Sequence, residues 1–579
     1  MNTKLKKIFS FKTLLYIAFL MCLICAIPFS RNAIISLTQK VMGRELRDFN
    51  KWDLIISHTM AYFAFIILAI YVFLYTNFGK RVSDYTKTTK AKLMSKESVK
   101  KWYPLAIVIV LITYTTLMLA NYDFVDDMRR IANGSIEWIS FSRYISEFSS
   151  ILLHTNFRLN DLAPYTQILA IFILAFTSYL VASIYSNGKI SFSIMMASLL
   201  SVTCPFIFMN VIYKFDSPYM ALSILFAVLP FLFVNDQKSF IFWSLICNML
   251  VMTSYQASNS VYIEMSILWG FLLWQRKENR KFLIFLVTAV LCYIVSLVIF
   301  KLLIMVPEEA SHNDIVSASA TLNLFDSLIL NFKAYFKQVF ENWGNLWIKL
   351  FSIGTIILFP INTLNNTKQN KVISILMSVL VLLLMFGLSF GAYLILKNSI
   401  ISTRAFMGFG FAISLIAVYN CISIKSKKQK INSVITCCLL YGFIIAGIVF
   451  GNAYRKHEKY ENFRVTLLFN DLNDLLSADS KPSMVVTGSM GTSGYNYFVQ
   501  KNYNFVPVNM MAGYMLYACQ DYNMNVYFPA GDLSAKDELS EEEYKKYMDL
   551  PLIKETYYHN IYGDNDMFRV ELKNPQFQK

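Results

Sequence analysis

Charged side chains crowd into a short segment that directly follows an apolar run. Residues 121–130 contain three carboxylates and two guanidinium groups within eight positions. Arg130 lies four residues after Asp126 and three after Asp127, so on a helix it would lie beside either carboxylate. A carboxylate can act as a general base and an arginine can hold a phosphate, so this segment could handle both a proton and an anion. The alternative is a polar turn that ends a membrane helix.

The elements that must position this segment are membrane helices. The chain of 579 residues is 56% hydrophobic and 16% charged, with a mean hydropathy of +0.45, which is more apolar than soluble proteins. Apolar runs long enough to cross a bilayer recur over the first 450 residues. The sequence therefore predicts an all-α polytopic membrane protein with a small C-terminal α/β domain. We expect about thirteen spans: 12–30, 53–76, 104–120, 165–185, 191–212, 219–234, 239–255, 260–275, 282–305, 344–361, 371–396, 403–424 and 432–450.

The positions of the lysines and arginines predict the orientation of these spans. The net charge of +16 does not indicate a nucleic-acid partner, because basic residues cluster in short loops between apolar runs. Thirteen spans with a cytoplasmic N-terminus place the basic loops 77–103, 275–281 and 425–430 inside the cell. One outer loop, 31–52, also carries five basic residues and does not fit this rule. The same orientation places the segments 121–164 and 306–343 and the tail after residue 450 outside.

Three parts of the chain follow from this arrangement. Residues 1–103 form two spans and a basic cytoplasmic loop, and residues 104–450 form a multispan catalytic domain. Residues 451–579 form an extracytoplasmic domain, with a helix over 460–476 and strands over 483–487 and 567–572. Three glycines follow the first strand at three-residue intervals, but they match neither nucleotide-binding spacing and indicate a strand-to-helix turn.

Both long outer segments are expected to contain an amphipathic helix. Apolar residues recur every three to four positions over 136–153 and over 325–343. In the first helix, Arg143 and Glu147 are four residues apart and could pair. These helices could lie in the outer membrane interface or pack against the spans.

Charged residues at the outer ends of spans are further candidates, because charges within a bilayer are costly. Glu264 lies about one turn into its span and could line a cavity or hydrogen-bond within the bundle. Asp216 precedes Ser217 and Pro218, where helix capping is an alternative role. Arg404 begins a span and could hold an anionic lipid headgroup. The nine cysteines show no spacing for zinc or for a disulfide framework, so no metal site is expected from them.

Several local motifs resemble one family. Asp126-Asp127-Met-Arg-Arg130, Gly134 followed by Trp138, Ser142-Arg143-Tyr-Ile-Ser-Glu147-Phe and Asp161-Leu-Ala-Pro164 are similar to motifs of the phage-type, serotype-converting O-antigen glucosyltransferases. Asp216-Ser-Pro-Tyr219 and Tyr255-Gln256-Ala-Ser258 resemble later motifs of that family. The resemblance covers roughly residues 104–450. The sequence departs from it where the family has Gly-Arg-Pro and this chain has Ser-Arg-Tyr.

The resemblance implies a GT-C-like glycosyltransferase of the bacterial inner membrane. The donor would be a hexose, expected to be glucose, on polyprenyl phosphate, and the acceptor a lipid-linked surface polysaccharide. The transfer would take place at the outer face. Asp126 or Asp127 would be the catalytic base. Helix geometry slightly favours Asp127, because it shares a helical face with Asp123 and Arg130. The other carboxylate would orient an arginine, or a divalent metal if one is used. The substrate-binding residues in the matching motifs would be Arg130, Arg143, Glu147, Asp216, Tyr255 and Gln256. Glu264 and Arg404 are added because of their positions at the outer ends of spans.

Three other functions fit parts of the sequence. A flippase or transporter of lipid-linked sugars would be expected to carry polar residues in the middle of the bilayer and internal repeats, whereas most charges here lie at outer ends of spans. A surface-polysaccharide polymerase is a related enzyme. A structural membrane partner without catalysis would not need the cluster of Asp and Arg residues.

Overall fold

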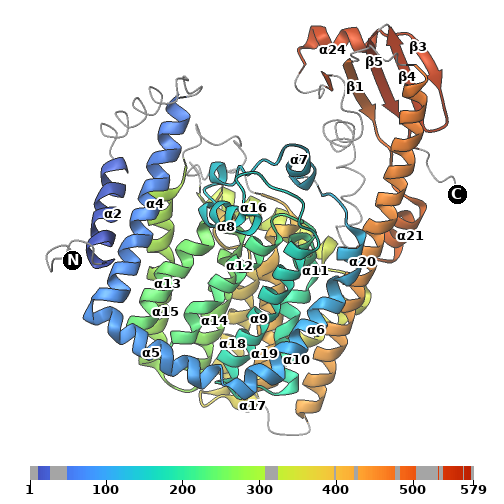
Figure 1. Ribbon diagram of the computed structural model, residues 1–579. Coiled ribbons are helices and arrows are strands. Elements are labelled where there is room, and N and C mark those ends of the chain that lie inside the picture. Colours follow the sequence, from blue (N-terminus) through green and yellow to red (C-terminus); the bar gives the residue numbers. More distant parts are fainter. Residues whose placement is uncertain are drawn as a thin grey trace.

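The computed structural model shows a helical bundle and a small C-terminal sheet (Figure 1). It describes residues 11–26, 49–124, 126–306, 324–396, 400–422, 428–475, 483–503, 532–533, 539–564 and 566–574. Most of the expected loops 31–52 and 425–430, and the first part of 306–343, lie outside these residues. The longer helices of the bundle are α2 (Phe11–Ala26), α4 (Phe49–Tyr75), α5 (Asn77–Leu93), α6 (Lys96–Ala120), α9 (Tyr165–Ser186), α10 (Phe192–Thr203), α12 (Ser217–Val228), α13 (Gln237–Met252), α14 (Asn259–Gln275), α15 (Asn279–Ile299), α16 (Leu324–Asn342), α17 (Leu346–Asn366), α18 (Lys371–Leu388), α19 (Met407–Ile422) and α20 (Lys428–Asn473).

Shorter helical segments connect or extend these helices. They are α7 (Asp126–Asn133), η1 (Ile139–Phe141), α8 (Tyr144–His154), α11 (Pro205–Val211), η2 (Leu229–Phe233), η3 (Gln256–Ser258), η4 (Phe300–Ile304), η7 (Gly391–Ile395) and η8 (Thr403–Ala405).

The prediction of a mostly helical chain with several apolar helices of membrane-spanning length is confirmed, but the count of thirteen spans is not. Within the described residues, seven helices are long and apolar enough to cross a bilayer, or eight if α10 and α11 form one span bent by 57°. Four further apolar segments, within α2, α12 with η2, α13 and α19, are shorter than a usual span. Each of the thirteen predicted runs nevertheless falls on one helix or on two consecutive helices. Apolar periodicity located the helices, while their short lengths leave the number of crossings open.

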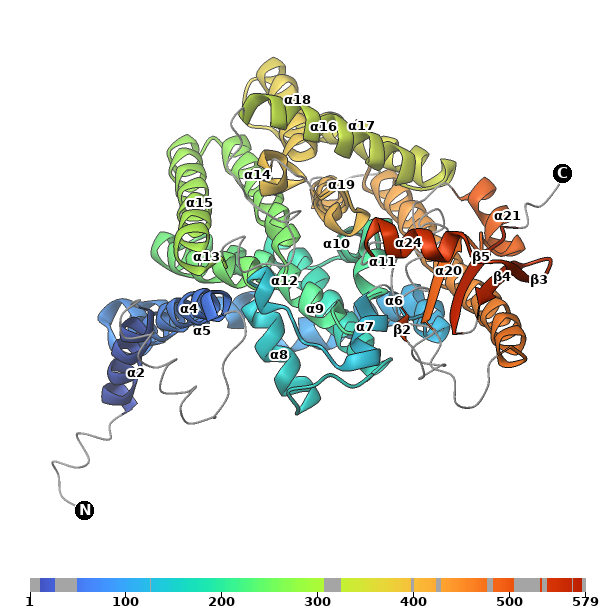
Figure 2. The same cartoon turned by 90° about the horizontal axis from the view of Figure 1, so that it is seen from above.

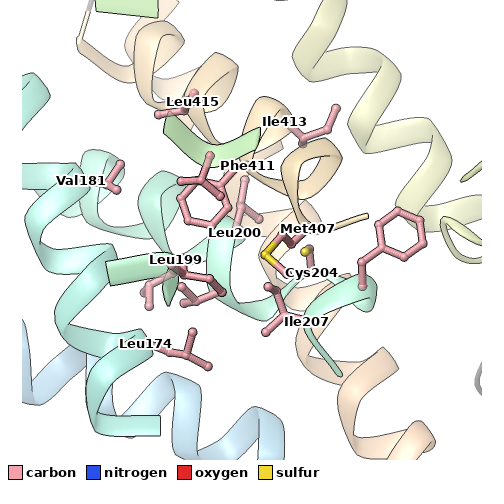
Figure 3. Packing of buried hydrophobic residues seen from close by; sticks show 14 of the residues in the cluster. Leu174, Val181, Leu199, Leu200, Cys204, Ile207, Met407, Phe411, Ile413 and Leu415 are labelled. Carbon is pink, nitrogen blue, oxygen red and sulfur yellow. The ribbon is translucent and has the colours of Figure 1, made fainter. Parts of the chain in front are cut away.

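The centre of the bundle is formed by helices that are almost wholly buried. In α9, α10, α11 and α19, apolar side chains such as Leu199, Ile207 and Phe411 pack together (Figure 3). Gly410 allows a close approach here, because a Cβ atom at this position would lie 2.2 Å from Sγ of Cys204. By contrast, α15 and α18 expose rows of large apolar side chains, as expected for helices that face lipid.

The two ends of the bundle carry different elements. At one end α7 and α8 cover the helices, and α8 packs beside α12 (Figures 1 and 2). At the opposite end α5 lies across the bundle (Figure 1). The expected basic loop 77–103 is therefore wrong as a loop. It forms α5 and the first residues of α6, because Thr76 and Ser95 each accept an N-cap hydrogen bond that starts a helix.

Helix α20 joins the bundle to the C-terminal part. Its 46 residues correspond to a length of roughly 70 Å, so it packs along α6 and extends past the end that carries α7 (Figure 1). The predicted helix 460–476 is thus not a separate helix but the end of this one. Arg464 is buried there and donates to the carbonyl oxygens of Met490, Tyr558 and Lys573 at 2.9, 2.6 and 2.8 Å. These bonds attach α20 to the sheet.

The C-terminal part is a five-stranded mixed sheet with the strand order β2-β1-β5-β4-β3. Strand β1 is parallel to β2 and β5, and β3, β4 and β5 form an antiparallel meander. Both predicted strands are confirmed, and Gly488 has the positive φ of +80° that a turn after β1 needs. The elements are β1 (Ser483–Gly488), α21 (Gly494–Asn502), β2 (Asp532–Leu533), α24 (Glu541–Met548), β3 (Leu552–Glu555), β4 (His559–Asp564) and β5 (Met567–Leu572).

Candidate active site

Asp127 fixes the first turn of α7 to the segment before α12. Its side chain is fully buried and accepts hydrogen bonds from the backbone N–H groups of Phe124, Lys214 and Phe215 at 3.3, 3.0 and 3.2 Å. Burial raises the pKa of the Asp127 carboxyl to about 7, while these N–H groups and the nearby Arg130 and Lys214 act in the opposite direction. Asp127 thus connects two segments that are far apart in sequence.

A buried polar contact joins α7 to the start of α12. It is formed by Arg130 of α7, Asp216 and Trp138. The Arg130 guanidinium donates to Oδ2 of Asp216 and lies 4.1 Å from the centre of the Trp138 ring. The indole N–H of Trp138 donates to the other Asp216 oxygen at 2.6 Å. Asp216 occupies the N-cap position of α12 but accepts no capping hydrogen bond, so its carboxylate serves this contact instead. Desolvation lowers the pKa of Arg130, and the nearby carboxylates Asp126 and Asp127 oppose that shift.

Glu147 extends this contact to α8. Its carboxylate accepts the backbone N–H of Trp138 at 2.9 Å, and burial raises the pKa of Glu147 to about 7.

The predicted single helix over 136–153 is wrong, since the helix is interrupted at Ser142, which has a φ of +60°. The predicted pair of Arg143 with Glu147 is also not formed. The break turns Arg143 away, toward Gln256, whose Oε1 accepts from Arg143 Nε at 3.1 Å.

We call Arg130, Asp216, Trp138 and Glu147 the buried frame. A second group of charges is more exposed than this buried frame and lies beside it. The Asp126 side chain is 48% exposed, and its Oδ2 lies 3.8 Å from Nη1 of Arg404. Arg143 is close enough for the charges of both residues to act on it. Desolvation chiefly lowers the pKa of Arg143, and the positive charge of Arg404 adds to this shift. Tyr255, Tyr393 and Asp126 act in the opposite direction. We call Asp126, Arg143 and Arg404 the outer charge cluster.

Aromatic and amide groups position the two arginines of the outer charge cluster. Arg143 lies 5.0 Å from the ring centre of Tyr255, and Arg404 lies 5.0 Å from that of Tyr213. The Tyr255 hydroxyl donates to the backbone carbonyl of Arg404 at 3.4 Å. Gln256 donates to the carbonyl of Phe141 at 2.8 Å, which orients its own carbonyl toward Arg143. The structure therefore brings nine of the ten predicted site residues into one continuous region around α7, namely Asp126, Asp127, Arg130, Arg143, Glu147, Asp216, Tyr255, Gln256 and Arg404.

Lys214 belongs to this region, although it was not among the predicted site residues. Its side chain is buried, and its ammonium group contacts the carboxylates of Asp123 and Asp161, the latter at 3.7 Å. The signal in the sequence is a single lysine in the short polar segment between two apolar runs. Lys214 thus connects Asp123, which precedes α7, to Asp161, which follows α8.

Glu264 is the predicted site residue that the structure places elsewhere. It lies inside α14, is fully buried, and neither carboxylate oxygen has a hydrogen-bond partner within the described part of the chain. In the residues that the structure covers, no group of three or more His, Cys, Asp or Glu side chains could hold a metal ion.

Comparison with known proteins gives one finding. A family model described as glucosyl transferase GtrII matches residues 115–415, which is just over half of the chain. Searches of curated proteins and of solved structures each found no match. The matched segment runs from the end of α6 into α19 and contains every residue of the outer charge cluster and of its buried frame. The family expected from the motifs is thus confirmed: this chain is a member of the GtrII glucosyl transferase family.

Proposed function

We propose that the protein transfers glucose from polyprenyl phosphate to a lipid-linked, O-antigen-like surface polysaccharide at the outer face of the bacterial inner membrane. Membership of the GtrII family implies glucosyl transfer. The observation that supports the finer proposal is the outer charge cluster, in which the half-exposed Asp126 carboxylate lies 3.8 Å from Arg404 and close enough to Arg143 to act on its charge. This modification of the polysaccharide is of the kind that changes a serotype.

The two arginines suit a phosphate leaving group. A sugar-linked polyprenyl phosphate is a phosphodiester with one negative charge, and the released monoester carries nearly two. Arg143 and Arg404 would hold this group and stabilise the charge that develops on it, since guanidinium groups bind phosphate oxygens in a planar fork. Two arginines and one aspartate give the outer charge cluster a net positive charge. The cluster therefore attracts the donor phosphodiester before the reaction and stabilises the more highly charged polyprenyl phosphate after it.

We assign the role of base to Asp126 rather than to Asp127. The acceptor hydroxyl forms a bond to the anomeric carbon, the bond from that carbon to the phosphate oxygen breaks, and polyprenyl phosphate leaves with the electron pair. The proton of the hydroxyl goes to the Asp126 carboxylate. Asp127 is fully buried and its oxygens accept three backbone N–H groups, so it has no open position toward a substrate. Arg130 is similarly committed to Asp216, which argues for a positioning role.

The distribution of basic residues supports an outer location for the transfer. Helix α5 lies at the end of the bundle opposite to α7 and carries Lys80, Arg81, Lys87, Lys90 and Lys92. Under the positive-inside rule that end is cytoplasmic. The N-terminus is then cytoplasmic, and the outer charge cluster and the sheet after α20 lie on the extracytoplasmic side.

A turnover assay tests this proposal. Purified protein in liposomes is given radiolabelled polyprenyl-phosphate glucose and a lipid-linked polysaccharide acceptor. We expect labelled acceptor to form, and Asp126→Asn to abolish this. Movement of the labelled donor across the bilayer without transfer would instead identify a flippase, and longer polysaccharide chains without glucose addition would identify a polymerase. A parallel reaction with a chelator tests whether a divalent metal takes part.

A further inference from the structure

A cavity of about 700 Å³ lies at the basic end of the bundle, opposite to the outer charge cluster. Its walls come from α5, from the ends of α9 and α14, and from the first turns of α13 and α15. Three cations line it, namely Lys92, Arg276 and Lys281, against one carboxylate, Glu278. Lys281 pairs with Glu278 at 2.7 Å. Neither Lys92 nor Arg276 forms a salt bridge with a residue that the structure describes, so the cavity has an excess of positive charge.

The lining of this cavity also contains neutral polar and aromatic groups, and it shares no residue with the outer charge cluster. Hydroxyl and amide groups of Thr89, Asn187, Asn235 and Gln237 line it together with the aromatic side chains of Tyr85, Tyr185, Phe240 and Trp269. Neutral hydrogen-bonding groups beside unpaired cations suit the ester oxygens and hydroxyls of a phosphate-bearing headgroup.

An apolar groove continues from the cavity along the outside of the bundle. This groove, of about 600 Å³, lies between α13 and α15 and shares Gln237, Ile284 and Thr288 with the cavity. Its other lining residues are all apolar: Ile241, Leu245, Leu283, Val287, Leu291, Cys292 and Val295. Several of them are highly exposed, including Val287 at 49% and Leu291 at 55%. A basic pocket thus continues into an apolar groove between α13 and α15, and α15 together with η4 is long enough to cross a bilayer.

The wall that α5 provides is firmly held. The carbonyl of Leu93 at its end accepts hydrogen bonds from the hydroxyls of Ser183 and Tyr179 in α9. Gly188 approaches the same point, and a Cβ atom there would lie 2.7 Å from the carbonyl oxygen of Lys92. At the other end of the wall Arg81 pairs with Asp236 at 3.1 Å. The cavity is therefore a built feature between fixed elements.

We propose that this cavity and groove bind one anionic phospholipid, with the headgroup phosphate between Lys92 and Arg276 and an acyl chain between α13 and α15. The charge excess at one end and the apolar groove at the other match the two parts of such a lipid in order. The site lies at the opposite end of the bundle from the proposed transfer reaction, so it is separate from donor binding.

Native mass spectrometry of the full-length protein tests this site. The protein is released from nanodiscs that contain equal amounts of phosphatidylglycerol and phosphatidylcholine. We expect one retained phosphatidylglycerol per chain, and at least a tenfold loss of its binding in the double variant Lys92→Glu/Arg276→Glu. The matched control is Lys90→Glu/Arg280→Glu. It changes the same residue types, two positions before Lys92 in α5 and four positions after Arg276, but outside the cavity lining.

The groove needs its own variant. Val287→Trp would fill it, whereas Val290→Trp places the same ring on an equally exposed position of α15 that does not line it. We expect only the first to weaken binding. Equal retention of phosphatidylcholine, or equal loss in both double variants, would overturn the proposal. So would full displacement of the lipid by inorganic phosphate with no effect of Val287→Trp, which would indicate a site for a free anion.

Discussion

The guanidinium of Arg130 and the carboxylate of Asp216 form a buried ion pair, although 86 residues separate them in the chain. The pair joins α7, which begins with the two adjacent aspartates, to the start of α12. Trp138 contacts both partners and carries the connection on to Glu147 and α8. These four side chains form the frame on which the outer charge cluster is held.

Breaking this ion pair should destabilise the protein. Removing one partner leaves the other as an uncompensated buried charge, so Asp216→Ala and Arg130→Ala should each lower the free energy of unfolding by about 3–5 kcal/mol. Arg130→Lys should recover only part of this, because a lysine restores the positive charge beside Asp216 but not the planar contact with Trp138. Thermal unfolding in detergent measures the effect. Asp84→Ala, which breaks an exposed pair with Lys87, is the control and should cost about 0–1 kcal/mol. Equal effects of Asp216→Ala and Asp84→Ala would contradict the role of the pair.

The two adjacent aspartates should respond differently to the same substitution. Asp126→Asn should keep donor binding and thermal stability but lose at least about a hundredfold in kcat, since the acceptor proton then has no base. Asp127→Asn should lower the melting temperature, because its oxygens accept three backbone N–H groups. Single-turnover rates and melting curves of both variants decide between them. A fully active Asp126→Asn protein would exclude this carboxylate as the base.

The arginines of the outer charge cluster should act on donor affinity. Hydrogen bonds to a charged group contribute about 1.5–3 kcal/mol, so Arg404→Ala and Arg143→Ala should each raise the donor KM by at least about tenfold. Lysine at either position should recover only part of this, since it lacks the planar fork. Arg158→Ala, an exposed arginine after α8, is the matched control and should change KM little. An unchanged KM in both alanine variants would place the phosphate elsewhere.

Stability should fall as the pH rises from about 4.5 to 7. The pKa of Glu147 is raised to about 7 by burial, whereas in the unfolded chain it has its ordinary value of 4.5. Between pH 4.5 and pH 7, Glu147 keeps its proton in the folded state but loses it in the unfolded state. The contribution of Glu147 to the free energy of unfolding is therefore fully present below pH 4.5 and is lost as the pH rises to about 7. The contribution is about 1–3 kcal/mol. Glu147→Gln should reduce the pH dependence of unfolding measured in this range. A variant with the same dependence as the parent would show that Glu147 does not titrate there.

The orientation can be measured with a membrane-impermeant thiol reagent. In a Cys519→Ser background, a cysteine at the exposed Tyr557 should react in intact cells, because the sheet follows α20 on the extracytoplasmic side. A cysteine at Lys90 in α5 should react only after the membrane is breached. The reverse pattern would put the outer charge cluster in the cytoplasm and remove the basis for a lipid-linked donor.

The sequence by itself determined the class of protein and the region of its chemistry. Apolar periodicity located the helices of the bundle, and the strands at 483–487 and 567–572 were recognised, because these patterns depend only on neighbouring residues. The motifs around Asp126 and Arg143 were enough to predict the family. The sequence did not determine the number of spans, since segments such as α13 and α19 are shorter than a bilayer-spanning helix and their crossing depends on packing.

Only the tertiary structure decided which charged residues are buried and paired and which remain exposed. Asp126 and Asp127 are adjacent and chemically identical, yet one is half-exposed beside Arg404 and the other is buried against the backbone of Lys214 and Phe215. Arg143 has Glu147 at helical spacing, but the left-handed backbone of Ser142 breaks the helix and sends it to Gln256. Partners that lie about ninety residues or more apart cannot be read from local spacing. They meet because the bundle brings the ends of α6, α11, α13 and η8 together at one end of the molecule, and burial there decides which charges pair and which remain open to a substrate.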